Sequence, residues 1–106
     1  MTREELETEI GRLKQGAEGL DEPDKTFKLN DIAQLEIELQ GMALADVTAA
    51  LRDITLPDLN EMKAQIDAAV DATSAHERRV NAFNTAYGLL TKGLRLAVGG
   101  GGQSWP

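Results

Sequence analysis

The feature that most constrains the fold is a run of mainly apolar residues spaced alternately by three and four from Leu59 to Ala97. Such a heptad stripe, sustained over this length, is typical of helices that pack as coiled coils. It predicts one helical arm of about 40 residues, roughly 60 Å long, that starts after the N-cap residue Thr55. The stripe is weakest at Thr73 and His76, where a bend is compatible with the pattern. Its members are Leu59, Met62, Ile66, Ala69, Thr73, His76, Val80, Phe83, Tyr87, Leu90, Leu94 and Ala97.

The composition favours an all-α fold for the same chain. Aromatic residues make up only 4% of the 106 residues, and a core of aliphatic side chains suits helix packing better than a β-sandwich. The absence of cysteine excludes disulfides, zinc fingers and thiol nucleophiles, and it fits a reducing compartment. No apolar run approaches the roughly 20 residues that cross a bilayer, and the charged start MTREELETEI shows no secretory signal. We therefore expect a cytoplasmic, all-α protein without membrane contact.

Residues 1–28 are expected to form a short acidic helix followed by a loop. Thr2 and Glu5 have the spacing of a capping box, which predicts a helix from Thr2 to about Gln15. Its apolar stripe is thin, so this helix must dock on another element. Residues 19–25, which include Pro23, are expected to form the loop.

Residues 29–98 are expected to form an oligomerisation core, an antiparallel helical hairpin whose second arm is the heptad stripe. The first arm runs from about Asn30 to Asp53, and a bend rather than a break is expected at Gly41. This arm is apolar on two faces, which is typical of a helix with two neighbours. The faces consist of Ile32, Leu35, Leu39 and Met42, and of Ile37, Leu44 and Leu51.

Two such surfaces exceed what one hairpin buries, which predicts a homo-oligomer of more than two subunits. The expected interface between copies lies on the heptad stripe. Its residues are Leu59, Met62, Ile66, Val80, Phe83, Tyr87, Leu90 and Leu94.

The charge is distributed unevenly along the chain. Eighteen acids against eleven Lys and Arg residues give a net charge of −7, yet no acid follows Glu77, whereas Arg78, Arg79, Lys92 and Arg95 do. An acidic body with a basic end predicts head-to-tail contact between copies, or contact with an acidic partner or nucleic acid. Because the net charge opposes approach to phosphates, we expect DNA contact to be weak and non-specific at most. A structural alternative stays open for each pair of cations. Lys92 and Arg95 suit the negative end of a helix dipole, and Arg78 and Arg79 can pair with acids of the second helix.

The sequence contains no catalytic, metal or cofactor signature. His76 is the only histidine and lies on the heptad stripe, so a core or interface position is expected for it rather than a ligand role. The chain has no GxSxG, Walker A or GxGxxG sequence. We therefore expect a non-enzymatic protein without a cofactor.

The last residues, 99–106, are predicted to be a flexible tail because four consecutive glycines cannot sustain a helix. Trp105 and Pro106 at its tip are expected to dock on a partner, since tryptophan often anchors interfaces. The alternative is a chain end whose tryptophan is incidental.

The order of these elements resembles the oligomerisation core of a small terminase subunit from a tailed phage or a gene transfer agent. The resemblance covers roughly residues 29–98 and is carried by the heptad stripe. It implies a ring of hairpin subunits that recruits or regulates the large, ATP-driven motor subunit during DNA packaging. Residues 1–28 are too few and too acidic for the family's usual DNA-reading domain, so the implied role is an adaptor without site-specific DNA recognition.

Two other classes are compatible with parts of the chain. Residues 26–29, 35–39 and 41–44 are similar to the start of phage tail assembly chaperones, which hold other tail components. The acidic charge also fits an inhibitor of a host nucleic-acid-binding defence complex, although the basic C-terminal part does not.

Overall fold

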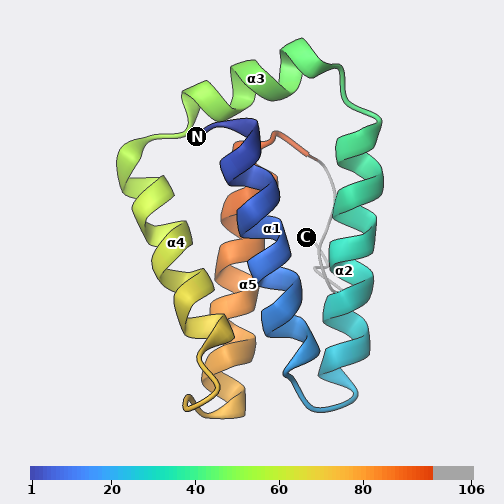
Figure 1. The fold of residues 1–106 in the computed structure, drawn as a ribbon, viewed down its shortest axis with the longest axis vertical. Helices are drawn as coiled ribbons and strands as arrows, with labels where there is room; N and C mark the ends of the chain where they lie inside the picture. Colours follow the sequence, from blue (N-terminus) through green and yellow to red (C-terminus); the bar gives the residue numbers. More distant parts are fainter. Residues whose placement is uncertain (97–106) are drawn as a thin grey trace, which may run out of the picture.

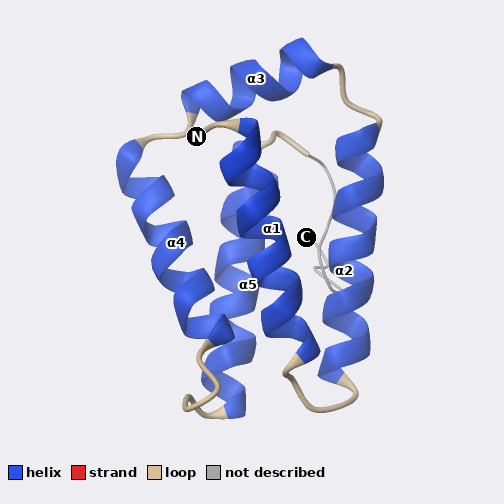
Figure 2. Cartoon of the chain, viewed as in Figure 1, coloured by secondary structure: helices blue, strands red, loops and turns tan. Residues whose placement is uncertain are grey.

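The computed structural model describes residues 1–96, and this part of the chain consists of helices and connecting turns without a strand (Figures 1 and 2). The predicted all-α fold class is confirmed. Four helices run lengthwise and α3 crosses one end of them (Figure 1). The helices are α1 (Arg3–Glu18), α2 (Asp24–Gln40), α3 (Leu44–Asp53), α4 (Leu56–Val70) and α5 (His76–Gly93).

Helix α1 begins as predicted and ends later. The Glu5 backbone N–H donates to Thr2 Oγ1 at 3.0 Å, and the Thr2 N–H donates to Glu5 Oε1 at 3.0 Å, which completes the capping box. The helix continues through Gly16 to Glu18. Gly16 is buried against α4, where a Cβ atom would lie 3.0 Å from the Ala69 carbonyl oxygen. This glycine therefore permits a close helix contact instead of ending the helix.

The second helical region differs from the prediction in where it begins and in what happens at Gly41. Helix α2 begins at Asp24 rather than near Asn30, and the chain breaks after Gly41 instead of bending. The Gly41 N–H closes α2 through the Ile37 and Glu38 carbonyls, and Ala43 is extended before α3 begins. The break lets α3 turn across the end of the bundle, where it buries Val47, Ala50 and Leu51.

The predicted arm of about 40 residues is wrong as a single helix. Helix α4 ends at Val70, the chain reverses, and α5 packs antiparallel beside α4 (Figure 1). The reversal is held by the Asp71 carboxylate, which accepts hydrogen bonds from the Thr73 N–H at 2.9 Å and the Thr73 hydroxyl at 2.6 Å. Such side-chain bonds to nearby backbone favour turns over helix. The molecule is consequently 38 Å in its longest dimension.

Most of the heptad stripe lies in the core of one chain. Phe83 and Tyr87 stack with ring centroids 5.9 Å apart, and the Tyr87 hydroxyl donates to the Asp31 carbonyl of α2 at 3.0 Å. Six of the eight residues predicted to join copies are at most 2% exposed, namely Met62, Ile66, Phe83, Tyr87, Leu90 and Leu94. In this fold they are not accessible to another copy, because α1, α2 and α3 cover them. Of the predicted interface, only Leu59 and Val80 retain partial exposure.

Among the described residues, no helix is long and apolar enough to cross a membrane.

Candidate protein-binding surface

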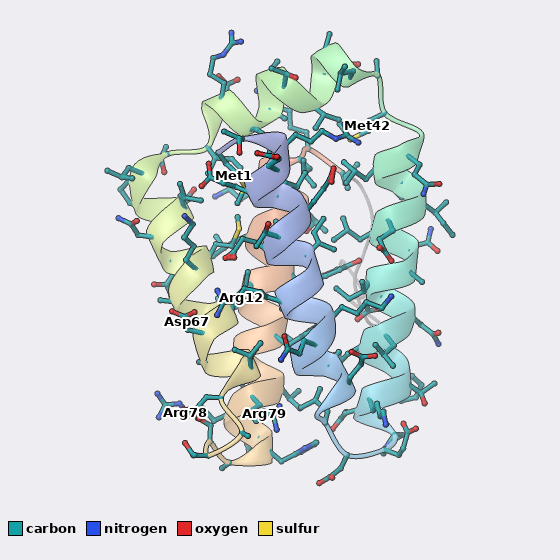
Figure 3. All side chains as sticks on the ribbon, in the orientation of Figure 1. Met1, Arg12, Met42, Asp67, Arg78 and Arg79 are labelled. Atoms are coloured by element: carbon teal, nitrogen blue, oxygen red, sulfur yellow. The ribbon has the colours of Figure 1, made fainter. Side chains whose placement is uncertain are left out.

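The four cations that follow Glu77, the last acid of the sequence, do not lie together at one end of the molecule. Arg78 and Arg79 lie at the start of α5 (Figure 3). Lys92 lies in the last turn of α5, and Arg95 lies beyond the end of this helix. Arg95 pairs with Asp53, so its charge is neutralised within the chain. The expectation of a basic end is therefore wrong in this fold, since the helix separates the two pairs of cations.

Arg79 is bound to backbone carbonyls. Its guanidinium donates to the carbonyls of Ala69 and Gly19, each at 3.1 Å, and to that of Gly16 at 3.5 Å. These carbonyls belong to the C-terminal ends of α4 and α1, where acceptors lack helical partners and the helix dipole is negative. The alternative in which Arg79 pairs with acids of the second helix is therefore wrong, because its partners are backbone carbonyls at the ends of α1 and α4.

His76 lies at the edge of the bundle instead of in the core. Its Nε2 donates to Asp24 Oδ2 at 2.8 Å, and its Nδ1 is 3.7 Å from Asp21 Oδ2. These contacts join the start of α5 to the start of α2. The predicted core position is wrong, because the carboxylates of Asp21 and Asp24 hold the ring at the edge of the bundle, whereas an interface position stays a prediction. Within residues 1–96 no three His, Cys, Asp or Glu side chains are grouped to hold a metal ion.

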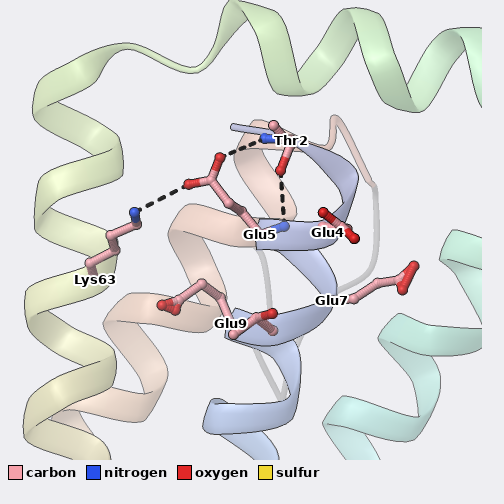
Figure 4. A pocket seen from close by; sticks show the side chains of 7 residues that line it. Thr2, Glu4, Glu5, Glu7, Glu9 and Lys63 are labelled. Carbon is pink, nitrogen blue, oxygen red and sulfur yellow. Dashed lines mark hydrogen bonds and ion pairs between the residues drawn. The ribbon is translucent and has the colours of Figure 1, made fainter.

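An acidic pocket of about 510 Å³ lies beside the start of α1 (Figure 4). The Lys63 ammonium donates to Glu5 Oε2 at 3.3 Å. The hydrogen bond from the Thr2 backbone, and next the Lys63 contact, lower the pKa of Glu5. The pocket is lined by Thr2, Glu4, Glu5, Glu7, Thr8, Glu9 and Lys63.

A buried glutamate of this pocket contacts an arginine that connects α1 to α4. Glu9 is only 6% exposed, and its Oε1 accepts a hydrogen bond from Arg12 at 3.2 Å. Arg12 also donates to Asp67 at 2.5 Å (Figure 3). This bond to Asp67 raises the pKa of Arg12. The Arg12–Asp67 pair joins α1 to α4, whereas the Glu9–Arg12 pair lies within α1.

A different surface has the character of a binding site, the outward side of α2. We call Phe27, Asn30, Ala33, Gln34 and Ile37 the α2 face; all five are exposed and none is charged. Phe27 is 56% exposed and Ile37 is 64% exposed. Charged residues are 27% of the chain, so five uncharged neighbours on one exposed helix face are notable, because protein interfaces are depleted of charge and enriched in aromatic residues.

The α2 face was partly visible in the sequence. Of the second apolar face predicted for this segment, the structure buries Leu51 and leaves Ile37 and Leu44 more than half exposed. Phe27 was not assigned to that face because the helix was expected to begin after it. Its spacing of ten residues from Ile37, as in a heptad pattern, is the signal that could have placed it there.

A groove of about 760 Å³ runs between α4 and α5. We call it the α4/α5 groove, and small side chains dominate its lining. The sequence did not predict this groove, because it forms only when the chain reverses at residues 71–75 and brings α5 beside α4. Its lining residues are Ala64, Gln65, Ala68, Ala75, Glu77, Arg78, Asn81, Ala82 and Thr85.

The predicted docking residues Trp105 and Pro106 lie outside the described residues. No protein-family model matches this chain, and the searches of curated proteins and of solved structures likewise find no match.

Proposed function

We propose that this chain is a non-enzymatic helical adaptor that binds other proteins through the α2 face. The observation that carries the proposal is the exposure of Phe27 and Ile37, at 56% and 64%, on a helix face without charge. Full burial of such side chains is worth about 1.5–3 kcal/mol each. Because each is already partly buried, a partner that covers both would gain roughly half of that from each.

Among the phage-related classes, the α2 face favours a tail assembly chaperone. Phe27, Ile37 and Leu44 lie within the three segments that are similar to those proteins, and all three are more than half exposed. A chaperone that holds other tail components needs such an apolar surface on the outside. This observation makes the chaperone our second candidate function.

A role similar to that of a small terminase subunit remains compatible with the adaptor proposal under one condition. Copies would have to meet through surfaces other than the heptad stripe, because most of that stripe is buried in one chain. The partner would then be the large motor subunit, contacted by protein surfaces. Arg79 and Arg95 are engaged within the chain. Arg78 and Lys92 are then the cations after Glu77 that make no hydrogen bond or ion pair within residues 1–96, which gives little support to DNA contact.

The test compares proteins retained by immobilised wild type and by two lysine variants. Ile37→Lys places a charge on the α2 face, and Leu56→Lys is the matched control at a leucine that is 67% exposed elsewhere. We expect a specific set of partners to be retained by wild type and Leu56→Lys and lost with Ile37→Lys, with each partner then confirmed as a purified protein. Retention of the same partners by both variants would contradict the proposal.

A further inference from the structure

We propose that the α2 face of one copy of this chain docks into the α4/α5 groove of the next copy, with α2 antiparallel to α5. The inference rests on the proposed function, in which the α2 face binds protein, and it names the partner as a second copy. It replaces the heptad stripe as the surface through which copies meet.

The two surfaces match in length. Phe27 and Ile37, the ends of the α2 face, are ten residues apart, and so are Ala75 and Thr85, which line the α5 side of the groove. At 1.5 Å per residue, both surfaces extend over about 15 Å.

The two surfaces also match in shape and polarity. The groove lining includes Ala64, Ala68 and Ala82, and such small side chains let a second helix approach closely with its larger side chains between them. The α2 face projects Phe27 and Ile37 as these larger side chains. Between them, the amides Asn30 and Gln34 would face Gln65 and Asn81 of the groove. Gln34 and Gln65 each donate to a glutamate one turn away, and their amide oxygens can accept hydrogen bonds across the contact.

The orientation follows from charge. Arg78 is exposed at the groove end formed by the start of α5. Within residues 1–96 no hydrogen bond from its guanidinium is seen, and its charge interacts with the exposed Asp71 carboxylate of the same chain. Glu38 is exposed beside Ile37 near the end of α2, where it accepts only a long bond from Gln34 at 3.4 Å. An antiparallel arrangement brings Glu38 of one copy to Arg78 of the next. Glu77 lines the same end and opposes Glu38, so Glu77→Gln should strengthen the contact.

The contact would be heterologous, because the two surfaces lie on different sides of the molecule. Helices α2 and α4 stand on opposite sides of α1 (Figure 1), so one copy can use both surfaces at once. Repetition of such a contact gives a ring if the rotation closes and an open chain of subunits if it does not.

Sedimentation velocity on the whole protein at several concentrations tests the proposal by charge exchange. We expect wild type to associate, and we expect Glu38→Lys and Arg78→Glu each to weaken association by up to about fivefold. The double variant Glu38→Lys/Arg78→Glu should recover it, since the pair is restored with reversed signs. The matched controls are Glu18→Lys and Arg52→Glu, both exposed elsewhere, with circular dichroism to establish folding.

Ile37→Lys and Leu56→Lys separate this proposal from the proposed function. Loss of association with Ile37→Lys but not with Leu56→Lys supports docking through the α2 face. A monomeric wild type, or a double variant without recovery, overturns the docking of copies. If other partners are still lost with Ile37→Lys in those cases, the adaptor proposal stands, and if Ile37→Lys changes neither association nor partner binding, both proposals fall.

Discussion

Arg79 links the ends of two helices with one half-buried side chain. Its guanidinium donates to carbonyls at the ends of α1 and α4, and hydrogen bonds from charged groups are worth about 1.5–3 kcal/mol each. We expect Arg79→Met to lower the free energy of unfolding by about 2–4 kcal/mol, because it also leaves acceptors without a partner. Urea unfolding measures the loss. The neighbouring Arg78→Met is the control and should stay within about 0.5 kcal/mol, since Arg78 is exposed; equal losses would contradict the assigned role.

Tyr87 makes stability sensitive to alkaline pH. Burial, and next the nearby Asp31 charge, raise the pKa of Tyr87 to about 12 from an ordinary value of 10.0. In the unfolded chain the phenol loses its proton near its ordinary pKa of 10.0, whereas the folded chain keeps the proton up to about pH 12. Between these two pH values the unfolded state therefore binds fewer protons than the folded state. The free energy of unfolding should therefore fall as pH rises from 10.0 to about 12, by a total of roughly 3 kcal/mol.

The control for this titration is Tyr87→Phe, which also removes the bond to the Asp31 carbonyl. Its stability should be lower at neutral pH, and it should lose less on going to alkaline pH than wild type does. Because Tyr87 is the only tyrosine, the absorbance of tyrosinate follows this group alone. A tyrosinate that forms with an ordinary midpoint in the folded protein would contradict the prediction.

Helix α1 contains two glycines in opposite environments, which gives a matched test of its packing. A Cβ atom at Gly11 would meet nothing within 4 Å, whereas at Gly16 it would lie 3.0 Å from the Ala69 carbonyl oxygen and 3.2 Å from its carbonyl carbon. Gly11→Ala should raise the free energy of unfolding by about 0.5–1 kcal/mol, because alanine is the better helix former. Gly16→Ala should lower it, since backbone of α4 must move away. Thermal unfolding compares the two, and a gain of stability in Gly16→Ala similar to that in Gly11→Ala would show that α1 is not held close to α4.

At the level of elements, the sequence predicts local signals well and the path of the chain poorly. The capping box of Thr2 and Glu5 was predictable because it depends only on neighbouring residues. The heptad stripe was misread because a reversal of the chain at residues 71–75 preserves its spacing. Two short antiparallel helices that face each other need the same apolar spacing as one long helix. Among the residues of the turn, Asp71 with Thr73 was the available signal, since its side chain competes with the helix backbone.

At the level of the whole molecule, the surface was the least predictable part. The four cations after Glu77 suggest one basic end, but two lie in the first turn of the 18-residue helix α5 and two lie in or beyond its last turn. Whether an arginine binds a partner or its own chain depends on which helix ends the fold brings near it, as Arg79 illustrates. The apolar face predicted for Ile37, Leu44 and Leu51 does not form, because the break after Gly41 places the two leucines on α3. Ile37 is left 64% exposed on α2.

The whole-molecule charge predicts an unusual dependence of stability on acid. Moderate acid reduces the repulsion that accompanies a net charge of −7, which favours the compact state. Three carboxylates act in the opposite sense. The Thr2 backbone N–H, the Thr26 side chain and the Thr73 side chain are the main causes that lower the pKa of Glu5, of Glu22 and of Asp71.

A carboxylate with a lowered pKa in the fold contributes stability above its ordinary pKa, and this stability is lost as pH falls through the folded value. We therefore expect stability to hold or rise from neutral pH down to about pH 5, and to fall below about pH 4. Urea unfolding at each pH measures this dependence. Added salt should reduce the change in stability between neutral pH and about pH 5, which comes from long-range repulsion, more than the fall below about pH 4. Glu5→Gln keeps the capping geometry without titrating, so it should reduce the fall below about pH 4, whereas Glu18→Gln should not. A fall that begins at neutral pH and is unchanged in Glu5→Gln would mean that these carboxylates do not govern acid stability.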